Sequence, residues 1–277
     1  MSELPLQIQR LAKQYKPIQQ GGLTLYPILV REFEEFSIAQ PALEVLHQSL
    51  PVALIRMPLL AALYAMDYDA VVSGQTATGL FARARLLLAL SLRLGDGLEA
   101  NQRVELMKVV VDRNDPRSLI CLRFTDSNGE ELAITPPQFK NLREIIAAQN
   151  GVDMLDESAN PDIVKAQKLM QEGNVQLDVT VDALVSAVSA LSGTDEADIY
   201  EWPILKLKKR SDAYLRILDY LVCGIGETNG ATWKNGNPTP HPFFKKIQNG
   251  GFATPMDTGK SNVPAGVQQI VAQTQNL

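Results

Sequence analysis

The stretch TPPQFKNLREIIAAQNG, residues 135–151, carries the signals that a helix needs at both ends. Thr135 can cap the helix, Pro136 suits its first position, and Gln138 can complete a capping box. The Asn-Gly pair at 150–151 predicts its end, because glycine readily adopts the left-handed conformation found after many helices. The side chains expected to face the core recur at helical spacing: Phe139, Leu142, Ile145 and Ile146.

Immediately upstream of this helix, the hydrophobic period changes from helical spacing to alternation. Ile120, Leu122 and Phe124 alternate with other residues, and the following Asn-Gly pair at 128–129 is a strong hairpin signal. A run rich in valine precedes them and ends at the turn signal Asn-Asp-Pro. We therefore expect a three-stranded antiparallel meander over residues 102–134.

Apolar residues at helical spacing predict helices on both sides of the meander. LTLYPILV, residues 23–30, is typical of an extended segment, and it leads into a short helix containing Phe33 and Phe36. A later helix meets Pro203, where it must kink or restart, and ends at Gly224 or Gly226. The fold class expected is α+β: a mostly helical body, a small antiparallel three-stranded β-meander inserted midway, and a flexible C-terminal tail. The expected parts are an N-terminal helical region at 20–101, the meander at 102–134, a C-terminal helical region at 135–226 and the tail at 227–277.

Composition and charge restrict the classes of function. Hydrophobic residues form 45 % and charged residues 21 % of the 277-residue chain, as in ordinary globular proteins. The net charge of −5 argues against general nucleic-acid binding, which needs a basic surface. The N-terminus has no apolar signal segment, and the longest apolar run, near residues 86–94, is too short to span a bilayer. We expect a cytoplasmic chain with no membrane partner and two free cysteines.

The chain shows no pattern for a catalytic, cofactor or metal site. The Gly-Lys-Ser at 259–261 lacks the earlier glycine of a phosphate-binding loop, because Thr254 stands there. His47 lies among apolar residues without a nucleophile or carboxylate beside it, which favours a structural role. The adjacent Glu32, Glu34 and Glu35 could ligate a metal, but such runs are more typical of a solvated surface near a helix start.

One dense basic cluster, KLKKR, contains Lys206, Lys208, Lys209 and Arg210. Such a cluster can bind an acidic partner or nucleic acid. It can equally be the polar face of an amphipathic helix with Leu205 and Leu207 turned inward. The acidic balance of the whole chain favours the second interpretation, and the first stays open.

The C-terminal stretch WKNGNPTPHPFFKK, residues 233–246, concentrates aromatic side chains in a proline-rich context. Two prolines flank His241 and restrict it to extended geometry, without placing it against any base or nucleophile. Extended aromatic peptides lose less entropy when they dock into a groove. We therefore expect a docking element, on this chain or on a partner, in which Trp233, His241, Phe243 and Phe244 make the contacts.

A resemblance to a known group of proteins lies in AITPPQFKNLREIIAAQNGVDMLDESANPDIVKAQKLM, residues 133–170. This block resembles a pattern in tail-module proteins of Gram-positive tailed phages and prophages, known as tail assembly chaperones. There, a helix of the form I-T-P-x-x-F-x-x-L-R-x-I-I-x-x-Q-N precedes D-E-x-x-N-P. The segment LTLYPILVREFEEF looks like the same group's entry segment. The resemblance implies no catalytic motif, and it implies partners among the other tail proteins, such as the tape measure or tail tube protein.

Three functions follow as hypotheses. The first is a non-enzymatic phage tail assembly protein of the host cytoplasm, which binds and shields other tail components. The second is a structural virion component, such as an adaptor or baseplate subunit. The third is a small hydrolase or transferase whose site is assembled from residues distant in sequence. A homo-oligomer is compatible with each of them.

Overall fold

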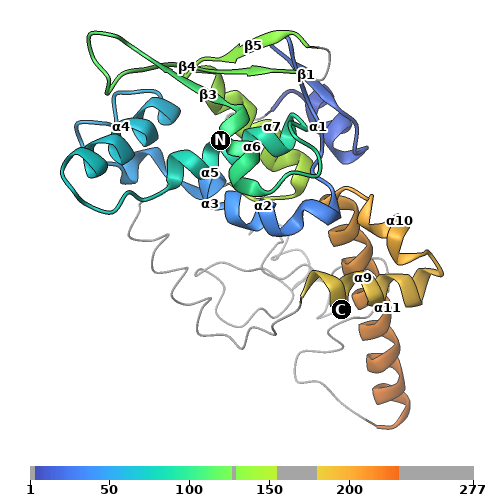
Figure 1. Cartoon of the computed structure of the whole chain (residues 1–277). Helices are drawn as coiled ribbons and strands as arrows, with labels where there is room; N and C mark the ends of the chain where they lie inside the picture. The colour runs from blue at the N-terminus through green and yellow to red at the C-terminus, as the bar shows by residue number, and fades with distance from the viewer. Residues whose placement is uncertain (1–3, 127–128, 155–179, 231–277) are drawn as a thin grey trace, which may run out of the picture. The chain divides into compact units, whose positions relative to one another are not determined.

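The computed structural model describes residues 4–126, 129–154 and 180–230, and its fold is α+β, as expected (Figure 1). The chain divides into two units between Lys209 and Arg210. The first unit holds the small sheets and nearly all of the described helices. Residues 155–179 of the expected C-terminal helical region and the expected tail from residue 231 onward lie outside the described residues.

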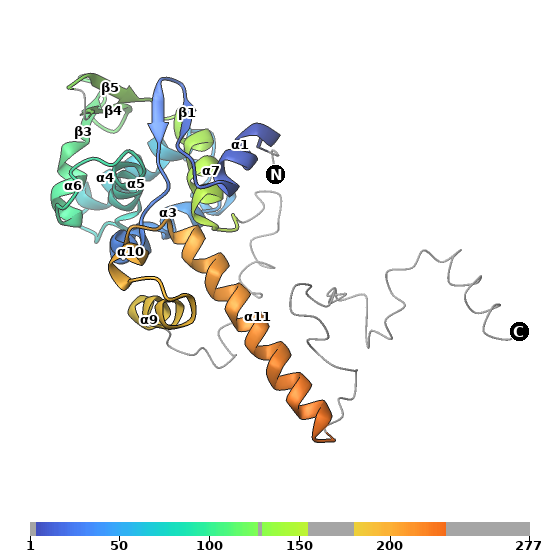
Figure 2. The same cartoon turned by 90° about the vertical axis from the view of Figure 1, so that its right-hand side faces the viewer.

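A three-stranded antiparallel sheet lies along one side of the helices of the first unit (Figures 1 and 2). Its order is β3-β4-β5, and Leu122 of the central strand stands opposite Ile134. Leu122 and Phe124 are buried in the main core, whereas Arg123 between them is exposed. The predicted alternation is confirmed at Leu122 and Phe124 but is wrong at Ile120, which is 50 % exposed. The buried side changes between Cys121 and Leu122, next to a register shift in the pairing with β3, so Leu119 and Cys121 are buried in place of Ile120. The strands are β3 (Lys108–Val111), β4 (Leu119–Thr125) and β5 (Glu131–Ile134).

The predicted first strand began too early. Residues 102–106 are helical, because they belong to α6 (Ala100–Leu106), and the sheet starts only at Lys108. Gln102 accepts a hydrogen bond from the backbone N–H of Glu99 through its side-chain oxygen, which stabilises the first turn of α6. Arg103, one residue later, is buried and ion-paired within the body. These two polar anchors outweigh the strand preference of the neighbouring valines.

A two-stranded hairpin precedes the predicted extended segment. β1 (Ile18–Gln20) pairs antiparallel with β2 (Leu23–Leu25) across Gly21 and Gly22, which both have positive φ. Two glycines at such positions match the tight turns that suit the twist of a hairpin. The Gly-Gly pair at 21–22 is a sequence signal for this hairpin. Only its second strand was expected, as part of the extended segment at residues 23–30.

The N-terminal helices bury a leucine-rich core. The α4–α5 connection is closed by Asp67, whose carboxylate accepts hydrogen bonds from the backbone N–H groups of Thr78, Gly79 and Phe81. A carboxylate at the start of α5 also interacts favourably with the helix dipole. The elements of this region are α1 (Leu6–Lys13), η1 (Val30–Glu32), α2 (Phe33–Ala39), α3 (Pro41–Glu44), η2 (His47–Ser49), α4 (Leu59–Val72) and α5 (Leu80–Ser91).

Helix α7 (Gln138–Asn150) packs against α1, α4 and β2. The expected capping box is only half formed. The backbone N–H and the hydroxyl of Thr135 donate to the Gln138 side-chain oxygen, at 2.8 and 3.0 Å, and the Thr135 carbonyl oxygen accepts from the Gln138 backbone N–H at 3.0 Å. The N-cap is Pro137 rather than the predicted Thr135, and no side chain caps the helix there. Gly151 ends the helix in the left-handed conformation, as predicted. The predicted core stripe is confirmed, since its four side chains are all buried: Phe139, Leu142, Ile145 and Ile146.

Three polar side chains of α7 are buried as deeply as its apolar ones, and two of them bind backbone groups of the hairpin region. Gln149 donates to the carbonyl oxygens of Lys16 and Leu25. Asn150 accepts from the backbone N–H of Ile28 at 3.0 Å. These bonds satisfy backbone N–H and C=O groups in a segment that is too irregular to form its own backbone hydrogen bonds.

Arg143 serves the next segment in the same way. Its guanidinium donates to the carbonyl oxygens of Leu43 and Val45, where α3 ends, at 2.8–3.2 Å. The residue is only 2 % exposed, so these carbonyl dipoles stabilise its charge in place of water. Helix α7 thus stabilises the irregular N-terminal segment at several separate points.

The described chain after residue 180 is helical. At Pro203 the helix restarts rather than kinks, since α10 ends at Tyr200 and α11 begins at Ile204. The residues on either side of Pro203 form backbone hydrogen bonds with the N-terminal part of the chain: Val30 N–H donates to Trp202 O, and Ile204 N–H donates to Ile28 O. The final helix ends at Thr228, slightly later than the glycines at 224 and 226 suggested. The elements are α9 (Val181–Ser192), α10 (Glu196–Tyr200) and α11 (Ile204–Thr228).

Replacing Asn150 with leucine removes the only side-chain acceptor seen for the buried Ile28 N–H among the described residues. We expect Asn150→Leu to lower the free energy of unfolding by about 1–3 kcal/mol, the usual cost of a buried donor left without a partner. Urea denaturation followed by circular dichroism measures this. Asn141→Leu, at an exposed position of the same helix, is the matched control and should change the value by less than about 0.5 kcal/mol.

Gly151 and Gly193 both end helices with positive φ, but only Gly151 is crowded. A Cβ at Gly151 would lie 2.6 Å from the Leu205 Cδ1 atom, whereas a Cβ at Gly193 would meet nothing within 4 Å. We expect Gly193→Ala to cost about 1–2 kcal/mol for backbone strain alone. Gly151→Ala should cost about 1 kcal/mol more because of overpacking. Equal losses in thermal unfolding would contradict the close approach of Leu205.

Candidate functional site

The structure describes only part of the residues predicted to bind a partner. Trp233, His241, Phe243 and Phe244, which form the expected docking peptide, lie outside the described residues. Lys206, Lys208, Lys209 and Arg210 lie near the start of α11.

The lysines of the basic cluster interact with the first unit. Lys206 Nζ lies 3.7 Å from the centre of the Trp202 ring, and Lys209 Nζ lies 5.1 Å from the centre of the Tyr15 ring. Both are cation–π distances. Lys208 Nζ approaches the Asn150 carbonyl oxygen, at the end of α7, at 3.4 Å. The arrangement agrees with the polar face of an amphipathic helix, and the inward side chains are Ile204 and Leu207, with Leu205 half-buried.

Beyond Arg210, α11 exposes a continuous apolar surface. Seven of its large hydrophobic side chains between residues 215 and 225 are exposed. Their exposed fractions lie between 36 % at Ile217 and 68 % at Val222. Exposed patches of this kind usually mark an interaction site. We name this surface the α11 face, and it consists of the half-buried Tyr214 and six of the seven exposed side chains: Leu215, Ile217, Leu218, Leu221, Val222 and Ile225.

The α11 face follows a heptad spacing. From Ile204 to Thr228, the residues on one side of the helix follow one another at intervals of three and four residues in turn. This spacing keeps one seam on one side of a helix. Ile204 and Leu207 lie at the start of that seam, and both are buried in the first unit. The later members of the same seam are Ser211, Tyr214, Leu218, Leu221 and Ile225.

The helical periodicity of this sequence does not separate the buried end of the helix from the exposed one. Leu207 and Leu221 fit the same periodic pattern, yet their exposed fractions are 3 % and 51 %. Periodicity tells which side of a helix is apolar, and says nothing about whether another element covers it. The glycines at 224 and 226 were read as a helix end, although they lie within α11.

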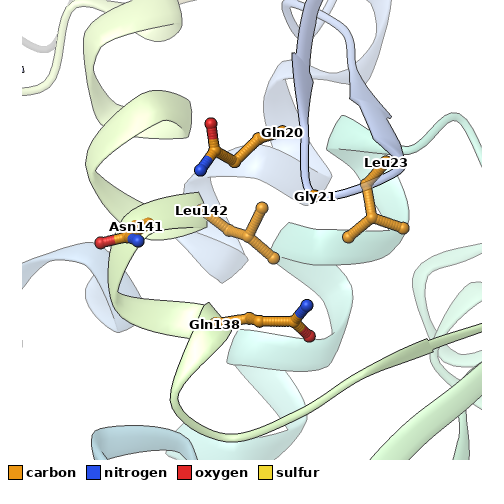
Figure 3. A pocket seen from close by; sticks show the side chains of 6 residues that line it. All are labelled: Gln20, Gly21, Leu23, Gln138, Asn141 and Leu142. Atoms are coloured by element: carbon orange, nitrogen blue, oxygen red, sulfur yellow. The ribbon is translucent and has the colours of Figure 1, made fainter. Parts of the chain in front are cut away.

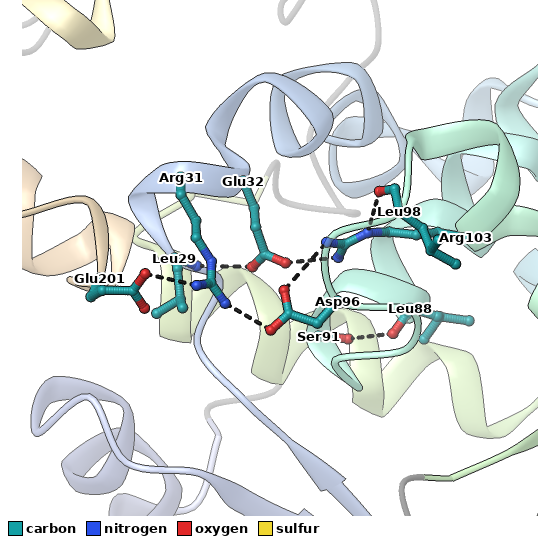
Figure 4. A network of polar contacts seen from close by, with 9 residues as sticks. All are labelled: Leu29, Arg31, Glu32, Leu88, Ser91, Asp96, Leu98, Arg103 and Glu201. Atoms are coloured by element: carbon teal, nitrogen blue, oxygen red, sulfur yellow. Dashed lines mark hydrogen bonds and ion pairs between the residues drawn. The ribbon is translucent and has the colours of Figure 1, made fainter. Parts of the chain in front are cut away.

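A network of ion pairs joins distant parts of the first unit (Figure 4). Arg31 binds Asp96 at 2.8 Å and Glu201 at 2.7 Å. Glu32, the next residue, binds Arg103 at 2.7 Å, and Arg103 also donates to the Leu98 carbonyl oxygen. The network therefore ties η1 to the loop before α6, to α6 itself and to the end of α10.

Glu32 corrects an expectation from the sequence. Glu34 and Glu35 lie in the first turn of α2, where acidic residues suit the helix dipole. Glu32, in contrast, is 5 % exposed, and its second oxygen accepts from the Leu29 backbone N–H at 3.3 Å. Its carboxylate thus has partners on both oxygens. The distant Arg103 could not be recognised as its partner from local sequence.

A small pocket lies between α7 and the β1–β2 hairpin (Figure 3). Its volume is about 120 Å³, below the range of about 300–1,000 Å³ usual for sites that enclose a ligand. The lining side chains carry amide and apolar groups, with no nucleophile and no ionisable group among them. The lining residues are Gln20, Gly21, Leu23, Gln138, Asn141 and Leu142.

The shifted pKa values have local structural causes. Burial, with a contribution from nearby Tyr68, raises the pKa of Tyr64, whose hydroxyl donates to the Pro116 carbonyl oxygen. A hydrogen bond to Asp182 raises the pKa of Tyr200. Burial lowers the pKa of Arg85, which donates to the carbonyl oxygens at the end of α6. Each group interacts with neighbouring structure outside the pocket of Figure 3.

Within residues 4–126, 129–154 and 180–230, no three metal-ligating side chains lie close enough together to hold an ion. In the same part of the chain, no helix has the length and apolar content needed to cross a bilayer. No protein-family model, no curated protein and no solved structure matches this chain.

The buried Glu32–Arg103 pair should contribute much more to stability than an exposed pair. Glu32→Gln leaves the Arg103 charge buried, and among the described residues Asp96, at 3.8 Å, is then its remaining ion-pair partner. We expect a loss of about 3 kcal/mol in the free energy of unfolding, measured in urea.

The exposed pair Arg117–Asp69, whose atoms also lie 2.7 Å apart, offers the control. Asp69→Asn should cost less than about 1 kcal/mol, because both side chains are solvated. Similar losses for Glu32→Gln and Asp69→Asn would show that the Glu32–Arg103 pair does not stabilise the body.

Proposed function

We propose that this chain is a non-enzymatic phage tail assembly protein that binds other tail components through the α11 face. The observation that carries the proposal is the run of exposed apolar side chains from Leu215 to Ile225 on one helix. Leaving seven such groups in water is costly for a free protein, at about 25 cal/mol per Å² of apolar surface. A partner that covers them recovers this free energy.

The spacing of the apolar side chains indicates the kind of partner. Leu218, Leu221 and Ile225 recur every three or four residues, the pattern by which one helix packs against another. An amphipathic helix of the partner can lay its own apolar side chains between them. The α11 face therefore suits a helical segment of another tail protein, which it would shield from aggregation before assembly.

The choice of tail assembly rests on the sequence resemblance at residues 133–170 and at residues 23–36. The exposed apolar side chains of the α11 face add support, because a protein that binds other proteins needs such a surface. Within the proposal, the tape measure protein is the first partner to examine, and the tail tube protein is the second. The protein would act in the host cytoplasm.

Co-expression tests this function. We expect the soluble fraction of the tape measure protein to rise several-fold when this chain is present, and Leu218→Ser with Leu221→Ser to abolish the increase. The double variant removes two apolar anchors that would each contribute about 1.5–3 kcal/mol when fully buried. Soluble and pelleted fractions are compared on gels, and purified particles are examined for the chain.

Val71→Ser with Val72→Ser is the matched control, because these residues are exposed apolar groups at the end of a different helix, α4. This control should leave the effect on the partner intact. No change in the solubility of either partner on co-expression with the unmodified chain would refute the proposed function. Finding the chain in particles at fixed stoichiometry would instead identify a virion component.

A further inference from the structure

We infer that a second copy of this chain covers the α11 face in the free protein, with the two helices antiparallel. The inference rests on the proposed function, since it describes what occupies that surface before a tail component takes it. Three features of α11 carry it: a seam that complements itself, a glycine with empty space above it, and opposite charges at the two ends.

The seam complements itself when two copies run in opposite directions. Reversing one helix exchanges the two kinds of seam position, so that Leu218 can stand opposite Leu221 of the second copy. In this register, Tyr214 lies opposite Ile225 of the second copy. The hydroxyl residues Ser211, which is buried, and Thr228, which is exposed, stand at the two ends of the seam. Each side chain of the seam thus faces an uncharged side chain of the second copy, and the seam buries no charge.

The flanks of the seam are apolar as well. Positions beside a two-helix seam usually carry charges that select the partner, but here they hold Leu215, Ile217 and Val222. In the same antiparallel register, Leu215 lies beside Val222 of the second copy. Ile217 lies beside Gly224 of the second copy. Both flanks therefore find apolar neighbours.

Gly224 is the second feature. Glycine inside a helix costs about 0.5–1 kcal/mol relative to alanine, so its presence there needs a reason. Nothing lies within 4 Å of the position that a Cβ of Gly224 would take, so the chain's own packing does not require glycine. A close approach by Ile217 of a second copy supplies that reason.

Charge is the third feature, and it involves the basic cluster. Arg210 and Glu227 are both exposed, at opposite ends of the α11 face. In the antiparallel register they approach each other across the pair on the same flank, about 3 Å apart along the axis at 1.5 Å per residue. Two such pairs form in a symmetric dimer. A parallel, in-register arrangement would instead leave Arg210 and Glu227 of the second copy about 25 Å apart along the axis, at 1.5 Å per residue.

Light scattering coupled to size-exclusion chromatography gives the first test. The full chain should elute as a dimer in the micromolar range. Arg210→Glu should weaken the dimer about tenfold, because both ion pairs become repulsive. Arg210→Glu combined with Glu227→Arg should restore it. A monomeric wild-type chain, or a single variant as tight as the wild type, would overturn the inference.

Direction is tested by spin labels at Asp212→Cys and, separately, at Asp219→Cys, in a Cys223→Ser background because Cys121 is buried. Antiparallel helices should place the two 212 labels about 20 Å further apart along the axis than the two 219 labels. Equal distances would show a parallel pair and contradict the inference.

The outcome is separable from that of the proposed function. A monomer that still solubilises the tape measure protein would refute the second-copy pairing alone. A dimer that leaves that protein insoluble would refute the tail-assembly function alone. Circular dichroism of each variant, compared with the wild type, reports whether the fold of the body has been kept.

Discussion

The fold depends on hydrogen-bond partners for the backbone groups that are buried in irregular segments. Between residues 16 and 45 the chain forms only short strands and helices, yet much of it lies inside the core. Helix α7 meets this need with Arg143, Gln149 and Asn150, whose side chains reach backbone groups far away in the sequence. Without them, the same burial would leave polar groups unpaired at a cost of about 1–3 kcal/mol each.

Signals that act within a few residues predicted a large part of the fold. The helix at 138–150, its Gly151 end and the buried positions of Leu122 and Phe124 follow from local patterns. At Pro203 the sequence left a kink and a restart open, and the helix restarts. The errors arose where a distant partner decides the outcome. Residues 100–106 are helical partly because Arg103 is buried against Glu32, and nothing near either residue in sequence reveals the other.

The candidate surface shows the same limit. Leu207 and Leu221 of α11 are equivalent in pattern and opposite in exposure. Only the three-dimensional structure separates the buried end of this apolar stripe from the end that stays exposed. The basic cluster also acquires its meaning from distant residues, since Tyr15 and Asn150 are the neighbours of its lysines.

The central claim is that the chain binds other proteins through the α11 face while the body around α7 stays unchanged. Hydrogen–deuterium exchange by mass spectrometry, with and without the tape measure protein, tests it most directly. The account predicts slower exchange concentrated in residues 211–228 on binding and unchanged exchange in α7. Protection elsewhere with no change in residues 211–228 would contradict it.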